Sequence, residues 1–234
     1  MIGVRGVEKS FGKEKVLKGV CLDIPPAEVF GLLGPSGSGK TTLIRILAGT
    51  LAADRGEVTL DGVRMPRRES LGRIGFMPQE DALYKDLSGQ DNLRFFGRLY
   101  GLRGPRLRGR IDDVLALTGL SGDARKRVAN YSGGMRKRLS LATALLHDPD
   151  VLLLDEPTVG IDPVLRRTIW EEFARLRAQG RTLLVTTHVM EEADRCDRAG
   201  LLYGGDLIAC GPVADLKASA PGGTLEGLFF QAAG

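Results

Sequence analysis

Residues 29–42 read VFGLLGPSGSGKTT, an apolar run of five residues followed by a glycine-rich loop. The apolar residues of 41–48 recur at helical spacing and predict a helix packed on a sheet. A buried strand, a loop of the form G-x-x-x-x-G-K-[ST] and a helix, in this order, are typical of a phosphate-binding loop. The stretch therefore predicts an α/β core that binds a nucleoside triphosphate.

The residues of this loop are expected to surround the phosphates. Its glycines let successive backbone N–H groups turn inward, and the helix N-terminus adds a positive end. We expect Lys40 to reach the β- and γ-phosphates and the Thr41 hydroxyl to ligate Mg²⁺. A chance glycine-rich turn is the alternative, and the flanking strand and helix argue against it. The predicted nucleotide ligands are Gly34, Pro35, Ser36, Gly37, Ser38, Gly39, Lys40, Thr41 and Thr42.

A second stretch, VLLLDEP at residues 151–157, places two carboxylates at the end of an apolar run. Continuous apolar strands are typical of parallel sheets, which bind ligands at the carboxyl ends of their strands. Asp155 and Glu156 are expected to end this strand on its opposite faces. Asp155 suits the Mg²⁺ shell, and Glu156 suits a general base that polarises the attacking water. A helix-capping or ion-paired role is the alternative for Glu156.

Two further signals lie at 131–135, YSGGM, and at His188, which follows the apolar and threonine run 182–187. A Ser-Gly-Gly turn at a helix start is a second anion site. In isolation it would be an ordinary helix cap, and the histidine would be structural. Since the chain already has a phosphate loop, the four motifs together indicate an ATPase that works as a pair.

The composition allows one large domain or two small ones, and excludes several classes of protein. The 234 residues are 43% hydrophobic and 26% charged, as in soluble globular proteins. No apolar run approaches the roughly 18–20 residues of a membrane span, and the first residues lack the apolar stretch of a secretion signal. The three cysteines contain no CxxC pair and are interpreted as reduced thiols. We expect a cytoplasmic protein.

The apolar pattern divides the chain. Strand-like runs at 2–8, 16–24 and 57–60 predict a small antiparallel sheet on the edge of the core. Residues 81–147 predict three amphipathic helices, an α-helical insertion between the two halves of the core. After 147 the pattern predicts a strand at 151–154, a helix over 165–176, a strand at 182–187, a helix at 190–195 and two final strands. The sequence thus predicts a single domain, with 1–80 and 148–234 as core plus antiparallel β-subdomain.

The net charge is +4, and arginines cluster near residues 64–68, 103–110, 125–127 and 136–138. Nucleic-acid binding, contact with an anionic membrane surface and solvated helix faces are three interpretations. No aromatic residues interleave with the clusters as base stacking requires, so we favour helix faces and expect no nucleic acid.

With these motifs, the chain resembles the ATP-binding subunit of an ATP-binding cassette (ABC) transporter. In the resemblance, Phe11 matches the aromatic that stacks on adenine. Gln79, in GFMPQED, matches the glutamine that touches Mg²⁺ and the γ-phosphate side and lies near the membrane subunit. Residues 131–135 match the signature motif, 160–162 the D-loop, and His188 the histidine that contacts the γ-phosphate.

The resemblance implies a P-loop NTPase core with a mostly parallel sheet, and a function shared by two chains. Each ATP would be sandwiched between the phosphate loop of one chain and Ser132, Gly133 and Gly134 of the other. Glu156, His188, Lys40 and Gln79 would be catalytic, and Thr41, Gln79 and Asp155 would hold Mg²⁺. The sequence departs from the family pattern at two motifs. The signature is more often LSGGQ, and here Tyr131 replaces leucine and Met135 replaces glutamine; because Met135 cannot form the hydrogen bonds of a glutamine side chain, it receives no ligand role. The D-loop reads VGID rather than SALD, but it keeps Asp162.

Stretches such as TVGIDP and THVMEEADRCDR resemble the lineage of drug, lipid and polysaccharide exporters. That resemblance implies a multi-span membrane permease as partner, a second identical or paralogous cassette, and a place on the cytoplasmic face of the membrane. A soluble cassette ATPase acting on nucleic acid or ribosomes is the alternative. Lys40 and Asp155 are 155 − 40 = 115 residues apart with no heptad run between them, and the chain has one cassette, so this alternative is disfavoured. A binding module without catalysis is disfavoured by the presence of Lys40, Glu156 and His188.

Overall fold

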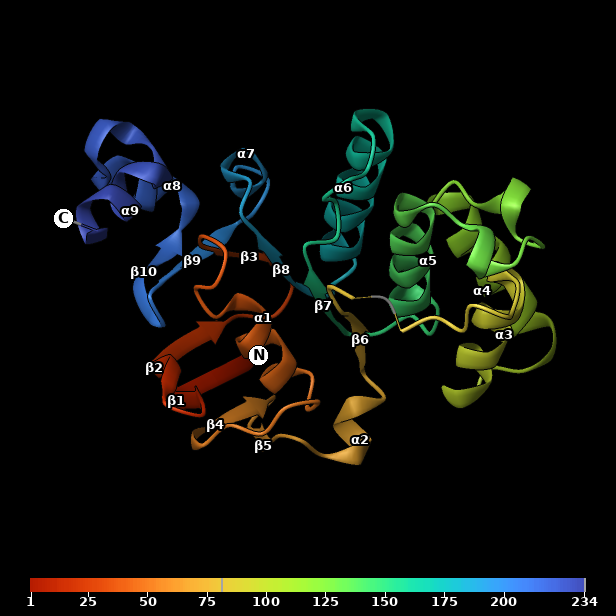
Figure 1. Cartoon of the computed structure of the whole chain (residues 1–234), viewed down its shortest axis with the longest axis horizontal. Coiled ribbons are helices and arrows are strands. Elements are labelled where there is room, and N and C mark those ends of the chain that lie inside the picture. Colours follow the sequence, from red (N-terminus) through yellow and green to blue (C-terminus); the bar gives the residue numbers. More distant parts are fainter. Residues whose placement is uncertain (81, 234) are drawn as a thin grey trace.

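The computed structural model describes residues 1–80 and 82–233, which form two sheets and a set of helices (Figure 1). The first sheet has the order β2-β1-β4-β5, and the second has the order β10-β9-β3-β8-β7-β6. The strands are β1 (Ile2–Phe11), β2 (Glu14–Ile24), β3 (Val29–Leu33), β4 (Arg55–Leu60), β5 (Val63–Arg64), β6 (Ile74–Met77), β7 (Val151–Asp155), β8 (Thr182–Thr187), β9 (Arg198–Tyr203) and β10 (Asp206–Pro212).

The first sheet is antiparallel, while in the second only the β9–β10 pair is antiparallel. Strands β9, β3, β8, β7 and β6 are parallel neighbours. The fold prediction of a mostly parallel core with an antiparallel β-subdomain is confirmed. The helices are α1 (Lys40–Leu47), α2 (Arg68–Leu71), α3 (Gly89–Leu99), α4 (Gly104–Leu117), α5 (Gly133–Leu145), α6 (Pro163–Ala178), α7 (Met190–Ala193), α8 (Val213–Ser219) and α9 (Leu225–Ala233).

The central strands are buried on both faces, because their side chains alternate between two hydrophobic cores. In β7, Leu152 and Leu154 join the core that contains α3–α6, whereas Val151 and Leu153 join the core beneath α1 and the antiparallel sheet. Strands β3 and β8 divide their side chains in the same way. Two-sided burial explains why these strands read as continuous apolar runs rather than alternating ones.

Helices α3, α4 and α5 lie together at one end of the molecule (Figure 1). They correspond to the three helices predicted within 81–147, and each contributes apolar residues to one core, among them Leu93, Ile111 and Leu139. The predicted boundary at Asp81 lies outside the described residues, as does Gly234, and the division into subdomains stays a prediction. Among the described residues, no helix is both long and apolar enough to cross a membrane.

The structure differs from the sequence predictions at several points. Strand β6 was not predicted, because IGFM is only four residues long and follows a short helix. Glu156 does not end β7 on the face opposite Asp155: it lies beyond the strand, with φ of 49°. The helix predicted at 190–195 ends at Ala193, and the segment after β10 contains two helices that the pattern did not indicate.

Several arginines of the basic clusters bind backbone carbonyl groups. Arg110 donates to Leu145 O and Leu146 O at the end of α5, at 2.7 and 3.1 Å. Arg138 donates to the carbonyls of Thr118 and Gly119 that follow α4, both at 3.0 Å. The last carbonyls of a helix lack intrahelical partners, so these contacts satisfy them and hold the helices together. This supports a structural interpretation of these arginines.

His147, to which the sequence assigned no role, connects α5 to the sheet. Its ring stacks on Tyr100 with centroids 3.6 Å apart, and Nε2 donates to Ile74 O at 3.2 Å. Nδ1 is buried and has no hydrogen-bond partner in the described part of the chain. Burial lowers the pKa of His147 to about 4, because a proton on Nδ1 would place an uncompensated charge in the interior.

The free energy of unfolding should therefore fall as the pH drops below the ordinary histidine pKa of 6.5. The unfolded chain takes up the proton there, while folded His147 resists it until about pH 4. His147→Phe keeps the stacking and cannot titrate. Between pH 7.5 and pH 5, we expect the free energy of unfolding of this variant to fall by about 1–2 kcal/mol less than that of the wild type. Urea unfolding at both pH values measures this difference, and equal losses would contradict the prediction.

Candidate functional site

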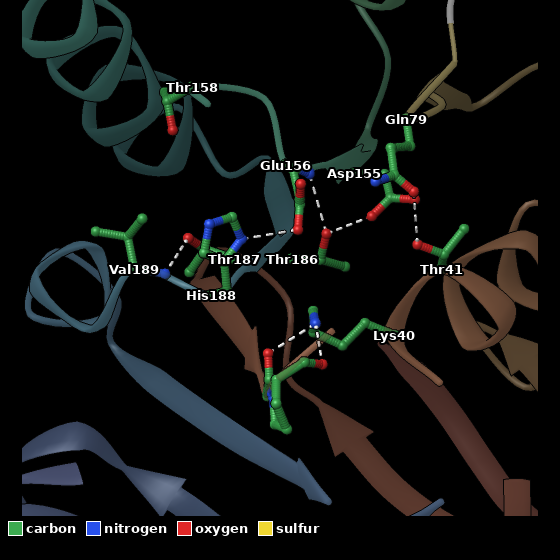
Figure 2. A network of polar contacts seen from close by, with 12 residues as sticks. Lys40, Thr41, Gln79, Asp155, Glu156, Thr158, Thr186, Thr187, His188 and Val189 are labelled. Carbon is green, nitrogen blue, oxygen red and sulfur yellow. Dashed lines mark hydrogen bonds and ion pairs between the residues drawn. The ribbon is translucent and has the colours of Figure 1, made fainter. Parts of the chain in front are cut away.

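The carboxyl ends of β3, β7 and β8 meet at one edge of the parallel sheet. Because these strands are parallel neighbours, the residues that follow them come together although they are far apart in sequence. Figure 2 shows Lys40, Thr41, Gln79, Glu156 and His188 around one space, with Asp155 at the end of β7. The predicted catalytic and metal-binding residues are thus brought together.

The loop between β3 and α1 has no room for side chains at two of its glycines. A Cβ on Gly34 would lie 2.2 Å from Leu202 O. Gly39 has φ of 106° and precedes α1, where a Cβ would lie 2.9 Å from Val16 O. No side chain caps α1, and its first turn contains no acidic residue. Its backbone N–H groups and positive end therefore stay available to an anion.

Lys40 is almost completely buried and binds back onto the loop that precedes it. Its Nζ donates to Gly34 O at 2.7 Å and to Pro35 O at 2.9 Å (Figure 2). Burial lowers the pKa of Lys40, and the charges of Glu156 and Asp155 act in the opposite direction. The loop carbonyls hold the ammonium group in place, and phosphate oxygens are stronger partners for the same group.

Asp155 is 1% exposed, and only one of its carboxylate oxygens is satisfied. Oδ1 accepts a hydrogen bond from Thr186 Oγ1 at 2.5 Å, whereas Oδ2 is buried without a partner among the described residues. Burial raises the pKa of Asp155, and the Thr186 hydrogen bond opposes that shift. A buried carboxylate oxygen without a partner is costly, so this oxygen is ready for a cation or an ordered water.

The oxygen donors around Asp155 fit a magnesium ion. Thr41 Oγ1 lies 3.4 Å from Gln79 Oε1, and both residues line a pocket with Asp155. A hydroxyl, an amide oxygen and a carboxylate belong to the hard oxygen ligands that Mg²⁺ takes, usually with several waters. The unpartnered Oδ2 of Asp155 supplies the charge that such a site needs.

Glu156 and His188 contact each other directly. His188 Nδ1 donates to Glu156 Oε1 at 2.9 Å, and the Glu156 side chain is 15% exposed. The backbone of Glu156 is held by Thr186, which accepts its N–H through both O and Oγ1. Left-handed backbone at a non-glycine residue is uncommon and costs about 1 kcal/mol or more, and such residues cluster at active sites.

Ser132, Gly133 and Gly134 are not brought into this group. Ser132 caps α5, accepting Met135 N–H at 3.2 Å, as expected of a Ser-Gly-Gly helix start. Ser132 and Gly133 are exposed, and none of the three forms a hydrogen bond to residues 34–42 within the described chain. Phe11 is also outside this group. It ends β1 and is 49% exposed, and the centroid of its ring lies 5.6 Å from Lys9 Nζ.

Sequence reasoning missed the threonines that hold the site together. Thr186 binds Asp155 and Glu156, and Thr187 accepts Val189 N–H at 3.0 Å (Figure 2). Both lie at the end of β8, fully buried. Threonine is common in strands, so the sequence indicated only that these residues form part of a strand. The feature that could have predicted their role is the pair of hydroxyl groups at the end of an otherwise apolar run.

Comparison with known proteins agrees with this geometry. The family model described as "ABC transporter" matches residues 17–159. The "Nod factor export ATP-binding protein I" of Paraburkholderia xenovorans is 45% identical over 219 residues, which cover 92% of this chain and 72% of that protein. The "Daunorubicin resistance ATP-binding protein DrrA3" of Streptomyces coeruleorubidus is 42% identical over 234 residues, covering 99% and 74%.

A solved structure shares the fold. The "dimeric structure of a post-hydrolysis state of the ATP-binding cassette MJ0796 bound to ADP and Pi" superposes with a TM-score of 0.82 at 27% identity, covering 91% of this chain and 98% of that one. Together with the phosphate loop and the carboxylates at the sheet edge, these matches show that the chain belongs to the ABC transporter family, as one of its ATP-binding cassettes.

Proposed function

We propose that this ATPase hydrolyses ATP at sites shared by two chains and thereby drives a separate export permease. The observation that carries the proposal is the separation of two anion sites. Lys40 and the catalytic candidates face one space, whereas Ser132–Gly134 begin another helix and are open to solvent. The relatives named for Nod factor export and daunorubicin resistance favour export.

The chemistry assigned to the chain is phosphoryl transfer to water. The α1 N-terminus and the loop N–H groups bind the phosphates, and Lys40 exchanges its two carbonyl partners for phosphate oxygens. Glu156 orients and polarises the water, and His188 donates to the γ-phosphate side. When bound by Thr41, Gln79 and Asp155, Mg²⁺ offsets the negative charge of the phosphates.

The signature residues complete the site from the opposite chain. Ser132 and the exposed N-terminus of α5 have the chemistry of an anion site, a hydroxyl and free N–H groups. A γ-phosphate between two chains would hold them together, and hydrolysis would release them. The ADP- and Pi-bound dimer of the similar cassette supports this arrangement.

An exposed apolar surface on the segment 84–100 supports the permease as partner. Tyr84, Leu87, Phe95 and Leu99 are each at least 36% exposed; the rings of Tyr84 and Phe95 lie 4.8 Å apart, and Leu87, Phe95 and Leu99 line one pocket. Exposed apolar clusters mark binding surfaces. Tyr84 follows Gln79 by five positions in the sequence, so we propose that a permease seated there acts on the metal and phosphate site through Gln79. We place the chain on the cytoplasmic face of the membrane, held by the permease.

Glu156→Gln should bind ATP, fail to hydrolyse it and accumulate as a dimer. The amide keeps the size of the side chain but cannot act as a base, so the nucleotide that joins the two chains persists. Size-exclusion chromatography with ATP measures the dimer, and phosphate release measures hydrolysis. Glu171→Gln, on the exposed face of α6, is the control. A Glu156→Gln chain that stays monomeric at high ATP and protein concentrations would contradict the shared site.

Ser132→Arg should keep ATP affinity and lose hydrolysis, because the altered residue faces the partner's nucleotide rather than its own. Lys40→Ala should lose ATP binding or hydrolysis on its own chain. Mixing the two inactive variants should restore turnover, since one pairing joins an intact loop to an intact signature. Phosphate release by the mixture and by each variant alone checks this. Full activity of Ser132→Arg alone would refute it.

Leu99→Glu should weaken binding to the permease and leave ATP affinity unchanged, because a carboxylate would interrupt the exposed apolar surface. The measurement is the amount of multi-span membrane protein that co-purifies with the tagged chain from native membranes. Phe230→Glu is the matched control, because Phe230 of α9 is 77% exposed and Leu99 is 68% exposed. If the Leu99→Glu chain recovers as much multi-span membrane protein as the wild type, this surface does not bind the permease.

A further inference from the structure

Glu192, in the short helix α7, is a buried carboxylate to which neither the resemblance nor the proposed function assigns a role. It is 4% exposed. Its Oε1 accepts a hydrogen bond from Thr158 Oγ1 at 2.5 Å, and its Oε2 accepts one from Thr187 Oγ1 at 2.7 Å. Burying a carboxylate is costly unless its oxygens are hydrogen-bonded, and here each oxygen has a buried hydroxyl donor.

The two donors belong to the two segments that carry the catalytic candidates. Thr158 lies two residues after Glu156, at the start of the loop that leads to Asp162 and α6. Thr187 ends β8 and immediately precedes His188. Glu192 thus connects the loop after β7 with the loop after β8, at the level where the two catalytic side chains face each other. The two threonines can be followed in Figure 2.

These contacts form a closed ring with the catalytic pair. His188 Nδ1 donates to Glu156 Oε1, the backbone leads from Glu156 to Thr158, Glu192 joins Thr158 to Thr187, and the backbone returns to His188. The ring is stiffened further because Thr187 Oγ1 also accepts Val189 N–H. His188 itself is 45% exposed, so little other packing fixes its ring.

The charge of Glu192 also reaches the signature helix. Burial lowers the pKa of Lys137 in α5, while the charges of Glu156, Asp155 and Glu192 act in the opposite direction. The N-terminus of α5 lies against the loop after β7, where a Cβ on Gly134 would be 3.4 Å from Gly160 O. The charge of Glu192 therefore acts on α5, the helix that Ser132 caps, as well as on the segments that carry the catalytic candidates.

We infer that Glu192 is a positioning residue for ATP hydrolysis, which holds Glu156 and His188 in register by binding the hydroxyls of Thr158 and Thr187. The inference rests on the proposed function. Glu192 contacts neither nucleotide nor water in this role: it restricts the two loops so that the base and the histidine meet the γ-phosphate together. Small displacements of such groups are costly, because catalysis depends on their alignment.

Glu192→Gln tests this, since the amide keeps the shape and leaves one hydroxyl without its acceptor. We expect kcat for ATP hydrolysis to fall about 10–100-fold, the usual effect of disturbing a supporting residue, while the Kd for ATP changes less than about threefold. The control is Glu191→Gln, the same change at the exposed neighbour in α7. A wild-type kcat, or a loss confined to ATP binding, would overturn the inference.

A double-mutant cycle separates positioning from general stabilisation. If Glu192 acts through the His188–Glu156 pair, Glu192→Gln should slow single-turnover hydrolysis much less in a His188→Ala chain than in the wild type. Losses that multiply would overturn the inference. Absence of hydrolysis in the wild-type chain would instead overturn the proposed function and this inference together.

A second pair of variants covers the case in which Glu192→Gln does not fold. Thr158→Val removes one donor at nearly constant volume, and Thr158→Ser retains it. We expect kcat to fall about 3–10-fold for valine and to recover for serine. Equal kcat for the valine and serine variants, with circular dichroism spectra like the wild type, would overturn the inference.

Discussion

The parallel pairing of β3, β8 and β7 is the constraint on which the rest of the structure depends. It brings the ends of these strands to one edge of the sheet, and it requires apolar side chains on both faces of each strand. As a result, Lys40, Asp155 and Glu156 meet at a largely buried place, where water screens their charges little and the charges interact strongly. The burial-lowered pKa of Lys40 and the burial-raised pKa of Asp155 are two effects of that environment.

Two of the site's polar groups are held by partners within the chain. Lys40 binds the carbonyls of Gly34 and Pro35, and His188 binds Glu156. One oxygen of Asp155 remains without a partner among the described residues. Phosphates would replace the carbonyl partners of Lys40, and a cation would fill the position beside Asp155, while the contact between His188 and Glu156 could remain. Preorganised groups of this kind contribute most to stabilising charge in a transition state.

The sheet edge contacts a nucleotide from one side only in the proposed function, and the α5 N-terminus is the element that would cover the other side. In the proposed site the loop and the carboxylates would cover one side of a nucleotide, while the exposed N-terminus of α5 belongs to the helical region at the end of the molecule. An anion site that is exposed in one chain fits a partner chain that closes over its nucleotide. The apolar surface of 84–100 lies on the same helical region, so the proposed contact with a permease and the proposed closure of the pair would involve neighbouring elements.

The sequence by itself determined the family, the core strands other than β6 and the residues that meet at the sheet edge. Glycine-rich loops and continuous apolar strands are local patterns, so the structures of VFGLLGPSGSGKTT and VLLLDEP can be predicted from these stretches alone. Only the tertiary structure decided that β6 pairs with β7, that Glu156 leaves the strand with a positive φ, and that His147 stacks on Tyr100 and binds Ile74 O. It alone decided that Thr158, Thr187 and Glu192 share hydrogen bonds. Such contacts join residues 5 to 34 positions apart, and hydroxyl and carboxyl groups carry no periodic signal of the partner they will meet.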